Sequence, residues 1–215
     1  SEKTIILGYG KYVKEKSLLN LLVRFETLLT AMQYFSYAKI GSPYMAVGRN
    51  LAYHRSEFFK VKGFINHMHI KSGDDDLFIQ DAANKKNTII TTSKDSFTES
   101  IAPNTFSEWF QQKRRHISSA NHYRFTHRFF LGLFFLSKVL FYFLAIVLSF
   151  FYPIKVLLPL IVFYFVVQFI VIHRSSKKLN EPMISYVFPF LEIILLLFHF
   201  SIFITNLSSK PTHWK

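Results

Sequence analysis

The sequence predicts an α/β region in its first half and an all-α membrane region of three transmembrane helices in its second. Short strand-like segments alternate with helical spacing up to residue 108, and three long apolar runs follow residue 128. The charge divides in the same way, because residues 1–108 carry a net charge of +3 and residues 109–215 carry +10. A basic chain can bind nucleic acid or a membrane, and the apolar runs favour the membrane.

Strand-like and helix-like patterns alternate in the first half. Residues 4–9 are apolar and end among glycines, and residues 87–92 are rich in β-branched side chains, as is typical of strands. Apolar side chains recur every three or four positions from 16 to 38, which predicts an amphipathic helix packed on a sheet. Two short β-like pieces are expected within 43–53, and a further helix at 77–83. These elements predict the later part of an α/β domain.

A basic segment joins the two halves. Thr105 and Glu108 fit a capping box, which predicts a helix that begins there and runs on through Arg115. We therefore expect three parts: a cytoplasmic α/β part at 1–108, a basic amphipathic juxtamembrane helix at 109–128, and a transmembrane region at 129–215.

Three apolar runs are long enough to cross a bilayer, which takes about 20 residues. They lie at about 129–152, 154–172 and 183–205. Ionisable side chains inside spans can form a transport path, and these runs contain Lys138, Glu192 and His199. Three helices are few for a transporter, so we expect Lys138 to extend toward the membrane surface and Glu192 to pair with a neighbour.

Loop charges predict the orientation of the spans. Basic residues gather before the first span and between the second and third, at Lys113, Arg114, Arg115, Arg124, Arg128, Arg174, Lys177 and Lys178. The other side carries Lys155, Lys210 and Lys215. Because cytoplasmic loops are enriched in Lys and Arg, we expect residues 1–128 in the cytoplasm and the C-terminus outside, in a bacterial inner (plasma) membrane.

The chain has no cysteine, which excludes disulfides, thiolate nucleophiles and Cys-ligated metal sites. No nucleic-acid reading motif accompanies the basic residues, so we expect membrane lipids and not nucleic acid as partners. No signal peptide is recognisable, and the first residue is Ser1. We therefore expect that the beginning of the protein is missing.

The sharpest polar feature is the run Ser72-Gly73-Asp74-Asp75-Asp76. Adjacent carboxylates repel one another, so the pKa of at least one tends to rise unless a cation neutralises them. Such a group suits general-base work or metal binding by oxygen ligands. A solvated acidic turn at the positive end of the following helix would have the same pattern, and both interpretations remain open.

A second polar cluster runs from Trp109 to His116. Arg115 and Lys113 could bind a phosphate or diphosphate, and Gln112 could bond a phosphoryl or sugar hydroxyl. A basic helix beside a membrane also attracts anionic lipids without any other ligand, and alone the cluster favours that interpretation.

A third short pattern contains Gly48 and Asn50. The glycine permits close backbone approach, and the amide of Asn50 can bond a polar ligand. In isolation, an ordinary turn between strands explains this pattern better.

The order of these elements resembles that of a known family. A G-x-N-x-A-[FY]-x-R block at 48–55 precedes Gly63-Phe64, the acidic SGDDDLF run and a W-x-x-Q-x-x-R block ahead of the membrane spans. The series resembles the family 2 glycosyltransferases, and more closely their membrane-embedded, cellulose synthase-like and hyaluronan synthase-like branch. The resemblance implies that the α/β part is the C-terminal portion of a GT-A-like glycosyltransferase domain.

The resemblance also implies roles for single residues. One carboxylate would act as the base on the acceptor hydroxyl. Aligning Asp76-Leu77 with the family's D-L gives Asp74, and aligning Gly73 with the family's glycine gives Asp75; we prefer Asp74. The substrate-binding residues implied are Gly48 and Asn50 at the sugar, Gln112, Arg115 and Lys113 at the donor diphosphate, and also Asp76, Trp109 and His116, the last in place of the family's acceptor tryptophan.

Such enzymes hold Mg²⁺ or Mn²⁺ against the donor diphosphate with a D-x-D motif in a nucleotide-binding N-terminal half. No such motif occurs before residue 40 of this chain. The resemblance therefore implies the C-terminal part of an inverting hexosyltransferase-type enzyme for polysaccharide or glycolipid synthesis. It would move a sugar from a nucleotide-sugar donor to a sugar or lipid-linked acceptor. Its metal ligands would lie in a missing N-terminal half, and the fragment alone would be inactive.

A second hypothesis is a non-catalytic membrane protein whose cytoplasmic module binds a partner or anionic lipid. The aspartates would then cap a helix, and the basic helix would contact lipid. Turnover of a nucleotide sugar separates the two hypotheses.

Overall fold

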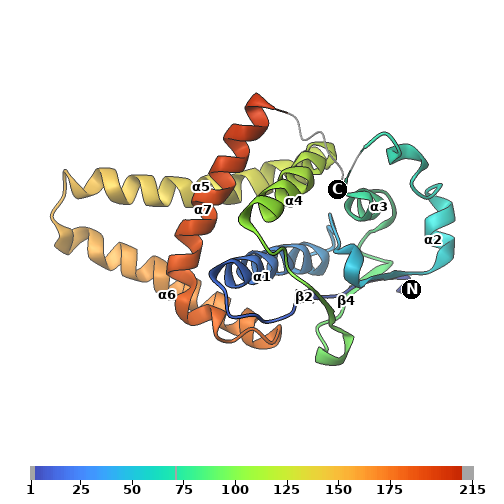
Figure 1. Cartoon of the computed structure of the whole chain (residues 1–215), viewed down its shortest axis with the longest axis horizontal. Coiled ribbons are helices and arrows are strands. Elements are labelled where there is room, and N and C mark those ends of the chain that lie inside the picture. The colour runs from blue at the N-terminus through green and yellow to red at the C-terminus, as the bar shows by residue number, and fades with distance from the viewer. Residues whose placement is uncertain (1–2, 71, 210–215) are drawn as a thin grey trace.

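The computed structural model describes residues 3–70 and 72–209. A small α/β region lies at one side, and a hairpin of two long helices, α5 and α6, projects away from it (Figure 1). A third long helix, α7, runs across the junction between them.

Two small sheets form the centre of the α/β region. The first has the order β3-β1-β4, in which β1 (Ile5–Leu7) pairs antiparallel with β3 (Leu51–Tyr53) and parallel with β4 (Thr88–Ile90). The second pairs β2 (Gly10–Tyr12) in parallel with β5 (Thr98–Ser100).

The strand predictions at 4–9 and 87–92 are confirmed by β1 and β4. Within 43–53 the structure has one strand, β3, because the residues just before it form the 3-10 turn η1 (Gly48–Asn50). Alternation along β1 buries its first and third side chains completely, and this face forms the core against the helix that follows.

That helix is α1 (Leu18–Lys39), which confirms the amphipathic helix expected at 16–38. Its N-terminus is capped by Ser17, whose hydroxyl accepts from the amide of Asn20 at 3.0 Å. One face of α1 packs on the sheet, and the other meets the long helices (Figure 1).

The shorter helices follow the sheet edges. They are α2 (Arg55–Lys60), η2 (Ile65–His67), α3 (Asp74–Ala82), η3 (Lys94–Ser96), α4 (Phe106–Ser119) and η4 (Ala120–His122). The helix expected at 77–83 begins earlier, at Asp74, because the aspartates form its first turn. The predicted capping box is confirmed, with the Thr105 hydroxyl and the Glu108 carboxylate each accepting a backbone N–H of the other residue.

The basic segment at 109–128 was predicted as one helix, and the structure divides it. Helix α4 ends at Ser119, the chain turns through η4, and α5 begins at Phe125. Arg128, expected ahead of the first span, therefore lies in the first turn of α5.

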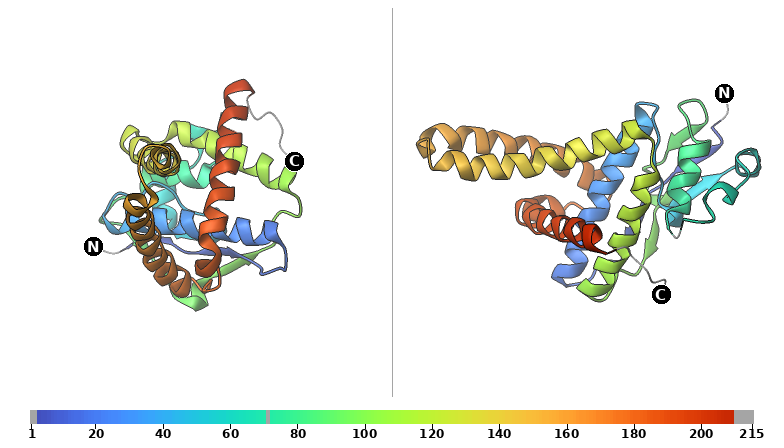
Figure 2. Two further views of the ribbon diagram at one scale, coloured as in Figure 1. Left: turned by 90° about the vertical axis from the view of Figure 1, so that its left-hand side faces the viewer. Right: turned by 90° about the horizontal axis from the view of Figure 1, so that it is seen from above.

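Within residues 3–70 and 72–209, three helices are long and apolar enough to cross a membrane: α5 (Phe125–Ser149), α6 (Ile154–Lys178) and α7 (Ile184–Ser208). They correspond to the runs expected at 129–152, 154–172 and 183–205. The first begins and ends earlier than predicted, and the second continues through its basic end. Helices α5 and α6 lie side by side, whereas α7 runs across them (Figures 1 and 2).

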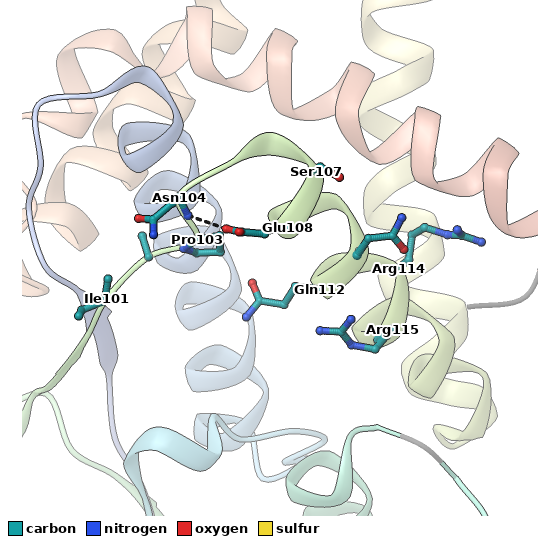
Figure 3. A pocket seen from close by; sticks show the side chains of 10 residues that line it. Ile101, Pro103, Asn104, Ser107, Glu108, Gln112, Arg114 and Arg115 are labelled. Carbon is teal, nitrogen blue, oxygen red and sulfur yellow. Dashed lines mark hydrogen bonds between the residues drawn. The ribbon is translucent and has the colours of Figure 1, made fainter. Parts of the chain in front are cut away.

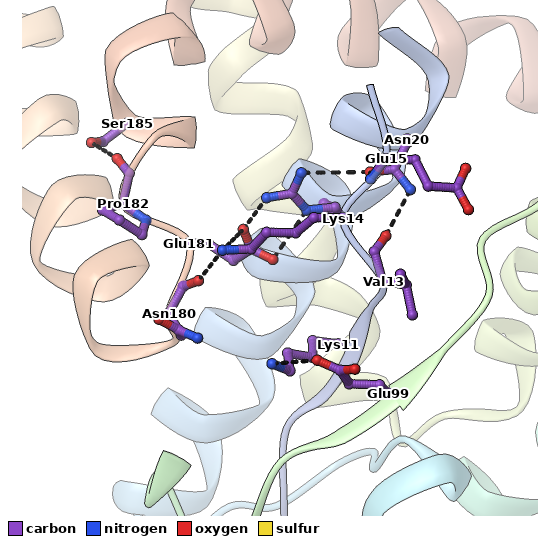
Figure 4. Close-up of polar contacts among 11 residues, drawn as sticks. Lys11, Val13, Lys14, Glu15, Asn20, Glu99, Asn180, Glu181, Pro182 and Ser185 are labelled. Carbon is purple, nitrogen blue, oxygen red and sulfur yellow. Dashed lines mark hydrogen bonds and ion pairs between the residues drawn. The ribbon is translucent and has the colours of Figure 1, made fainter. Parts of the chain in front are cut away.

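A buried ion pair connects the N-terminal end of α7 to α1. Glu181, just before α7, accepts hydrogen bonds from the guanidinium of Arg24, and both side chains are buried. Lys14 adds a second, longer ion pair to the same carboxylate at 3.7 Å (Figure 4).

Hydrogen bonds connect the C-terminal end of α7 to α4. The guanidinium of Arg114 donates to Asn206 at 2.8 Å and to the carbonyl of Ser209 at 2.7 Å. Between these ends, the ring of Trp109 stacks on Phe198 with centroids 3.8 Å apart. Both ends of α7 therefore contact the α/β region.

The ionisable residues of the long helices also pair with one another. Lys138 of α5 donates to Glu192 of α7, and Tyr142 donates to the same carboxylate at 2.8 Å. The expectation that Glu192 pairs with a neighbour is confirmed. The expectation for Lys138 is wrong, because its amine points into the helix packing and forms this ion pair. Lys210 and Lys215, used in the orientation argument, lie outside the described residues.

Glu181→Gln should destabilise the protein strongly, because it leaves the buried Arg24 guanidinium without its counter-charge. Removing one partner of a buried pair costs about 3–5 kcal/mol. Thermal unfolding in detergent measures this. The matched control is Glu99→Gln at the Lys11–Glu99 pair (Figure 4), where Glu99 is 55% exposed; it should cost about 0–1 kcal/mol. Equal effects of the two variants would contradict the role of the buried pair.

Candidate active site

A cavity of about 460 Å³ brings together the three polar patterns of the sequence. Its walls come from the η1 turn, from the start of α3 and from α4. The predicted residues that line it are Gly48, Asp74, Asp75, Asp76, Gln112, Lys113 and His116.

The backbone before α3 places the three aspartates at the cavity. Gly73 caps α3 with a φ of 81°, in the left-handed region that favours glycine. A Cβ at this position would also lie 2.5 Å from the Cβ of Ser119 at the end of α4. The glycine therefore permits both the sharp entry into α3 and its close contact with α4.

The three carboxylates have different surroundings. Asp74 is exposed at the cavity. Asp75 is half-buried, and its Oδ2 accepts from the Gly48 amide at 2.7 Å while its Oδ1 accepts from the amide of Asp76 at 3.0 Å. Burial raises the pKa of Asp75 above its usual value, although these two backbone amides oppose the rise.

Asp76 is buried behind the cavity. Its Oδ2 accepts from the hydroxyl of Tyr123 at 2.5 Å. Burial raises the pKa of Asp76 well above its usual value and the charge of Asp75 adds to the rise, while the Tyr123 hydrogen bond opposes it. Burial therefore disfavours the charged form of Asp76, and the hydrogen bond from Tyr123 positions the start of α3.

The opposite wall holds an ion pair between α4 and α1. Lys113 bonds Glu26 at 2.6 Å, and Glu26 is buried. Burial alone would raise the pKa of Glu26, but the charge and hydrogen bond of Lys113 together with His199 and His116 lower it. Burial and the same ammonium lower the pKa of His116 to about 4, so its imidazole is neutral at pH 7.

Arg115 lies on the next face of α4, at a second cavity of about 660 Å³ (Figure 3). Gln112 and Ile101 line both cavities, so the two spaces adjoin. The guanidinium of Arg115 makes no hydrogen bond or ion pair with any residue that the structure describes. The side-chain oxygen of Gln112 is buried and also lacks a partner within that part of the chain.

Two predicted site residues line neither of these cavities. The amide of Asn50 donates to the carbonyls of Tyr9 at 3.0 Å and Ser96 at 2.7 Å, so it connects the segment between β1 and β2 to the η3 turn. Trp109 is fully buried against Phe198 of α7. In this structure both residues therefore support the fold around the site, because their polar or aromatic groups are engaged elsewhere.

Glu26 and Tyr123 were not predicted from the sequence, although both contact predicted residues. Glu26 could have been found from the sequence, since it lies one helical turn after Leu22 on the apolar face of α1, where a charged side chain needs a partner. Tyr123 could not have been found, because a tyrosine just before a membrane helix is common at membrane interfaces and indicates no particular contact.

The described residues do not fit a divalent cation. No group of three or more His, Asp or Glu side chains within 3–70 and 72–209 is placed to hold a metal ion. The two oxygens of Asp75 face backbone amides, and Asp76 faces Tyr123. Asp75 and one oxygen of Asp76 are thus already hydrogen-bonded by the protein, and Asp74 is the exposed carboxylate of this run.

Asp76→Asn should raise stability at high pH. A carboxyl whose pKa is higher in the folded than in the unfolded chain stabilises the fold at low pH, and this stabilisation is lost as the pH rises through the folded-state pKa. The amide cannot ionise, and its oxygen still accepts from Tyr123. Thermal unfolding from pH 4 to 8 should show a higher melting temperature for Asp76→Asn than for the wild type at pH 8, and this difference should vanish in acid. The exposed Asp95→Asn should show no such change. A variant advantage that grows toward acid would contradict the raised pKa.

Comparison with known families covers almost the whole chain. The family model of glycosyl transferase family group 2 matches residues 5–207. No curated protein matches the chain. The matched range includes the α/β region, the aspartates of α3, the basic face of α4 and all three long helices. The chain therefore belongs to the family group 2 glycosyltransferases.

Proposed function

We propose that this chain belongs to an inverting glycosyltransferase at the cytoplasmic membrane face, and that it contains the catalytic base and the binding site for the acceptor. The whole protein moves a sugar, of hexosyl type, from a nucleotide-sugar donor to an acceptor hydroxyl. The observation that carries the proposal is the half-buried Asp75, with a raised pKa, in a cavity next to the membrane helices and to Arg115, whose guanidinium has no partner among the described residues. The order of the motifs favours the membrane-embedded, cellulose synthase-like branch.

Asp75 is the better candidate for the base, although the sequence alignment favoured Asp74. The amide of Gly48 orients the Asp75 carboxylate, and its raised pKa brings it closer to the proton affinity that general-base catalysis needs. Asp74 is exposed and has no comparable contact holding it in one place. Asp76 is engaged by Tyr123 and serves as support.

The reaction balances with one base. The acceptor hydroxyl gives its proton to Asp75, and its oxygen attacks the anomeric carbon of the donor sugar. The bond from that carbon to the diphosphate oxygen breaks, and the nucleoside diphosphate leaves with the electron pair. Attack from the face opposite the leaving group inverts the anomeric configuration.

Arg115 and Gln112 are placed to hold the leaving diphosphate. Arg115 presents an unpaired guanidinium at the cavity that adjoins the aspartates, and Gln112 lies between the two cavities. A fixed cation at a leaving phosphate stabilises charge that develops in the transition state. Lys113, expected beside them, is compensated by Glu26 and contributes less net charge. The divalent ion of the family would be held by residues other than those described.

The lipid-binding alternative has less support. Under it, the basic face of α4 should be free to meet lipid headgroups. Instead Lys113 bonds Glu26, and Arg114 bonds the end of α7. Arg115 faces a cavity.

Asp75→Asn in the full-length protein should lower kcat by about 10²–10⁴, because the amide cannot accept the proton. Binding of the nucleotide-sugar donor should be nearly unchanged. In the wild type, kcat/KM should fall tenfold per pH unit below the pKa of Asp75, which lies above that of an ordinary aspartate. Release of nucleoside diphosphate, measured with a panel of UDP- and GDP-hexoses, checks both results.

Asp74→Asn is the matched control, since it removes an adjacent carboxylate that has no hydrogen bond to Gly48. It should keep most of the turnover. Loss of turnover in Asp74→Asn with activity retained in Asp75→Asn would assign the base to Asp74 instead.

We further propose that residues 1–124 are cytoplasmic, that α5 and α6 cross the membrane as a hairpin, and that α7 lies along the cytoplasmic side of the membrane. The sequence predicted that α7 crosses and that the C-terminus is outside. Both ends of α7 bond the α/β region, through Glu181 and through Asn206, so crossing would pull one end away from its partners.

Membrane thickness agrees with this arrangement. From Lys138, where α5 meets α7, to its end at Ser149, α5 has about 11 residues, a rise of roughly 17 Å. Helix α7 adds its own diameter of about 10–12 Å. Together they approach the ~30 Å hydrocarbon core, so the hairpin reaches across if α7 is embedded at the near side.

Labelling of single cysteines tests this topology, and the wild-type chain offers a cysteine-free background. In right-side-out vesicles a membrane-impermeant maleimide should label Tyr152→Cys at the tip of the hairpin and leave Ser208→Cys at the end of α7 unlabelled. Ser208→Cys should be labelled when the vesicles are opened. Labelling of Ser208→Cys from outside would show that α7 crosses.

A further inference from the structure

We propose that the acceptor is a hydroxyl-bearing membrane lipid whose hydrocarbon chain occupies a third cavity, between α1, α4, α5 and α7. This inference rests on the proposed function and names the acceptor class. The cavity has a volume of about 400 Å³. It is continuous with the aspartate cavity, since both are lined by Glu26, Thr30, Met45, Asp76, Lys113 and His116.

The walls of this third cavity are mainly hydrocarbon. The apolar lining comes from three helices and includes Leu29 of α1, Leu131, Phe134 and Phe135 of α5, and Leu195 and Leu196 of α7. A glycan carries hydroxyls along its whole length, and each needs a partner when it leaves water. These walls offer few such partners, so they fit an alkyl or isoprenoid chain better than a growing polysaccharide.

The charged side chains of the cavity are already compensated. Lys113 pairs with Glu26, and Lys138 pairs with Glu192. Asp76 accepts a hydrogen bond from the Tyr123 hydroxyl, and burial raises its pKa and so disfavours its charged form. A neutral chain therefore meets no uncompensated charge from these groups.

The cavity lies where lipid can enter it. Phe134 lines it from α5 and is 45% exposed on the surface of a helix that is apolar enough to lie in a membrane. A chain can thus slide in from the bilayer while its head points toward α3. In that position its head group reaches His116 and the aspartate cavity.

The head group must carry a hydroxyl. A lipid phosphate is already a nucleophile without a base, and its charge would be repelled by the carboxylates of Asp74 and Asp75. A hydroxyl needs the base that Asp75 provides, and the neutral imidazole of His116 can bond it without adding charge.

Photolabelling of the full-length protein in nanodiscs tests the site. The probe is hexadecanol with a diazirine in its chain, and mass spectrometry locates the cross-links. Leu196→Trp fills the cavity from α7, and its neighbour Leu197→Trp, at a position 63% exposed and outside the lining, is the matched control. Leu131→Trp fills the same cavity from α5, in case the first variant does not fold.

Cross-links should map to cavity residues of α1, α5 and α7 in the wild type. They should fall by about tenfold or more in the filling variants and stay unchanged in Leu197→Trp, because overpacking excludes the chain. Cross-links that lie only on the outer faces of α5 and α6 in wild type would overturn the proposal.

A turnover assay on the same samples separates this proposal from the proposed function. Elongation of a water-soluble oligosaccharide at an equal rate in wild type and Leu196→Trp would overturn the lipid acceptor and keep the glycosyltransferase. Cavity labelling without turnover of any nucleotide sugar would keep the lipid site and contradict the proposed function.

Discussion

Two buried ion pairs made by residues of α1 hold α7 and α4 against this helix. Arg24 bonds Glu181 at the start of α7, and Glu26 bonds Lys113 of α4. Charges in a low-dielectric interior are costly without a partner, so each pair constrains the helix that supplies the partner. Helix α1 thereby contacts the sheet, the site and the long helices at once, and the shapes of the cavities between these parts depend on its position.

The chemistry of the site follows from small differences in surroundings. Three aspartates in one helical turn receive different partners: solvent at Asp74, the Gly48 amide at Asp75 and the Tyr123 hydroxyl at Asp76. One acidic run thus provides three carboxylates that differ in exposure and in hydrogen bonding. In the same way, three adjacent basic residues of α4 have different partners. Lys113 pairs with Glu26, Arg114 bonds the end of α7, and Arg115 faces a cavity, so the three differ in the net charge that they present.

Local patterns predicted what local forces decide. The spacing of apolar residues gave α1, and the capping box gave the start of α4, because both depend on residues within a few positions of each other. The assignment of Asp75 over Asp74 was not predictable, because it depends on an amide 27 positions away in the sequence. Hydropathy found α7 but could not show that both of its ends bond the α/β region. The sequence also predicted Asn50 at the sugar, whereas its amide donates to the backbone carbonyls of Tyr9 and Ser96.

The central claim is a single displacement in which one carboxylate serves as base. The anomeric configuration of the product tests it most directly. The full-length protein in native membranes would be given a nucleotide sugar with an α-linked donor bond, and the new linkage would be determined by NMR. The account predicts a β-linkage, because the acceptor attacks opposite the leaving diphosphate. An α-linked product would require two displacements or a different geometry, and would contradict the role assigned to Asp75.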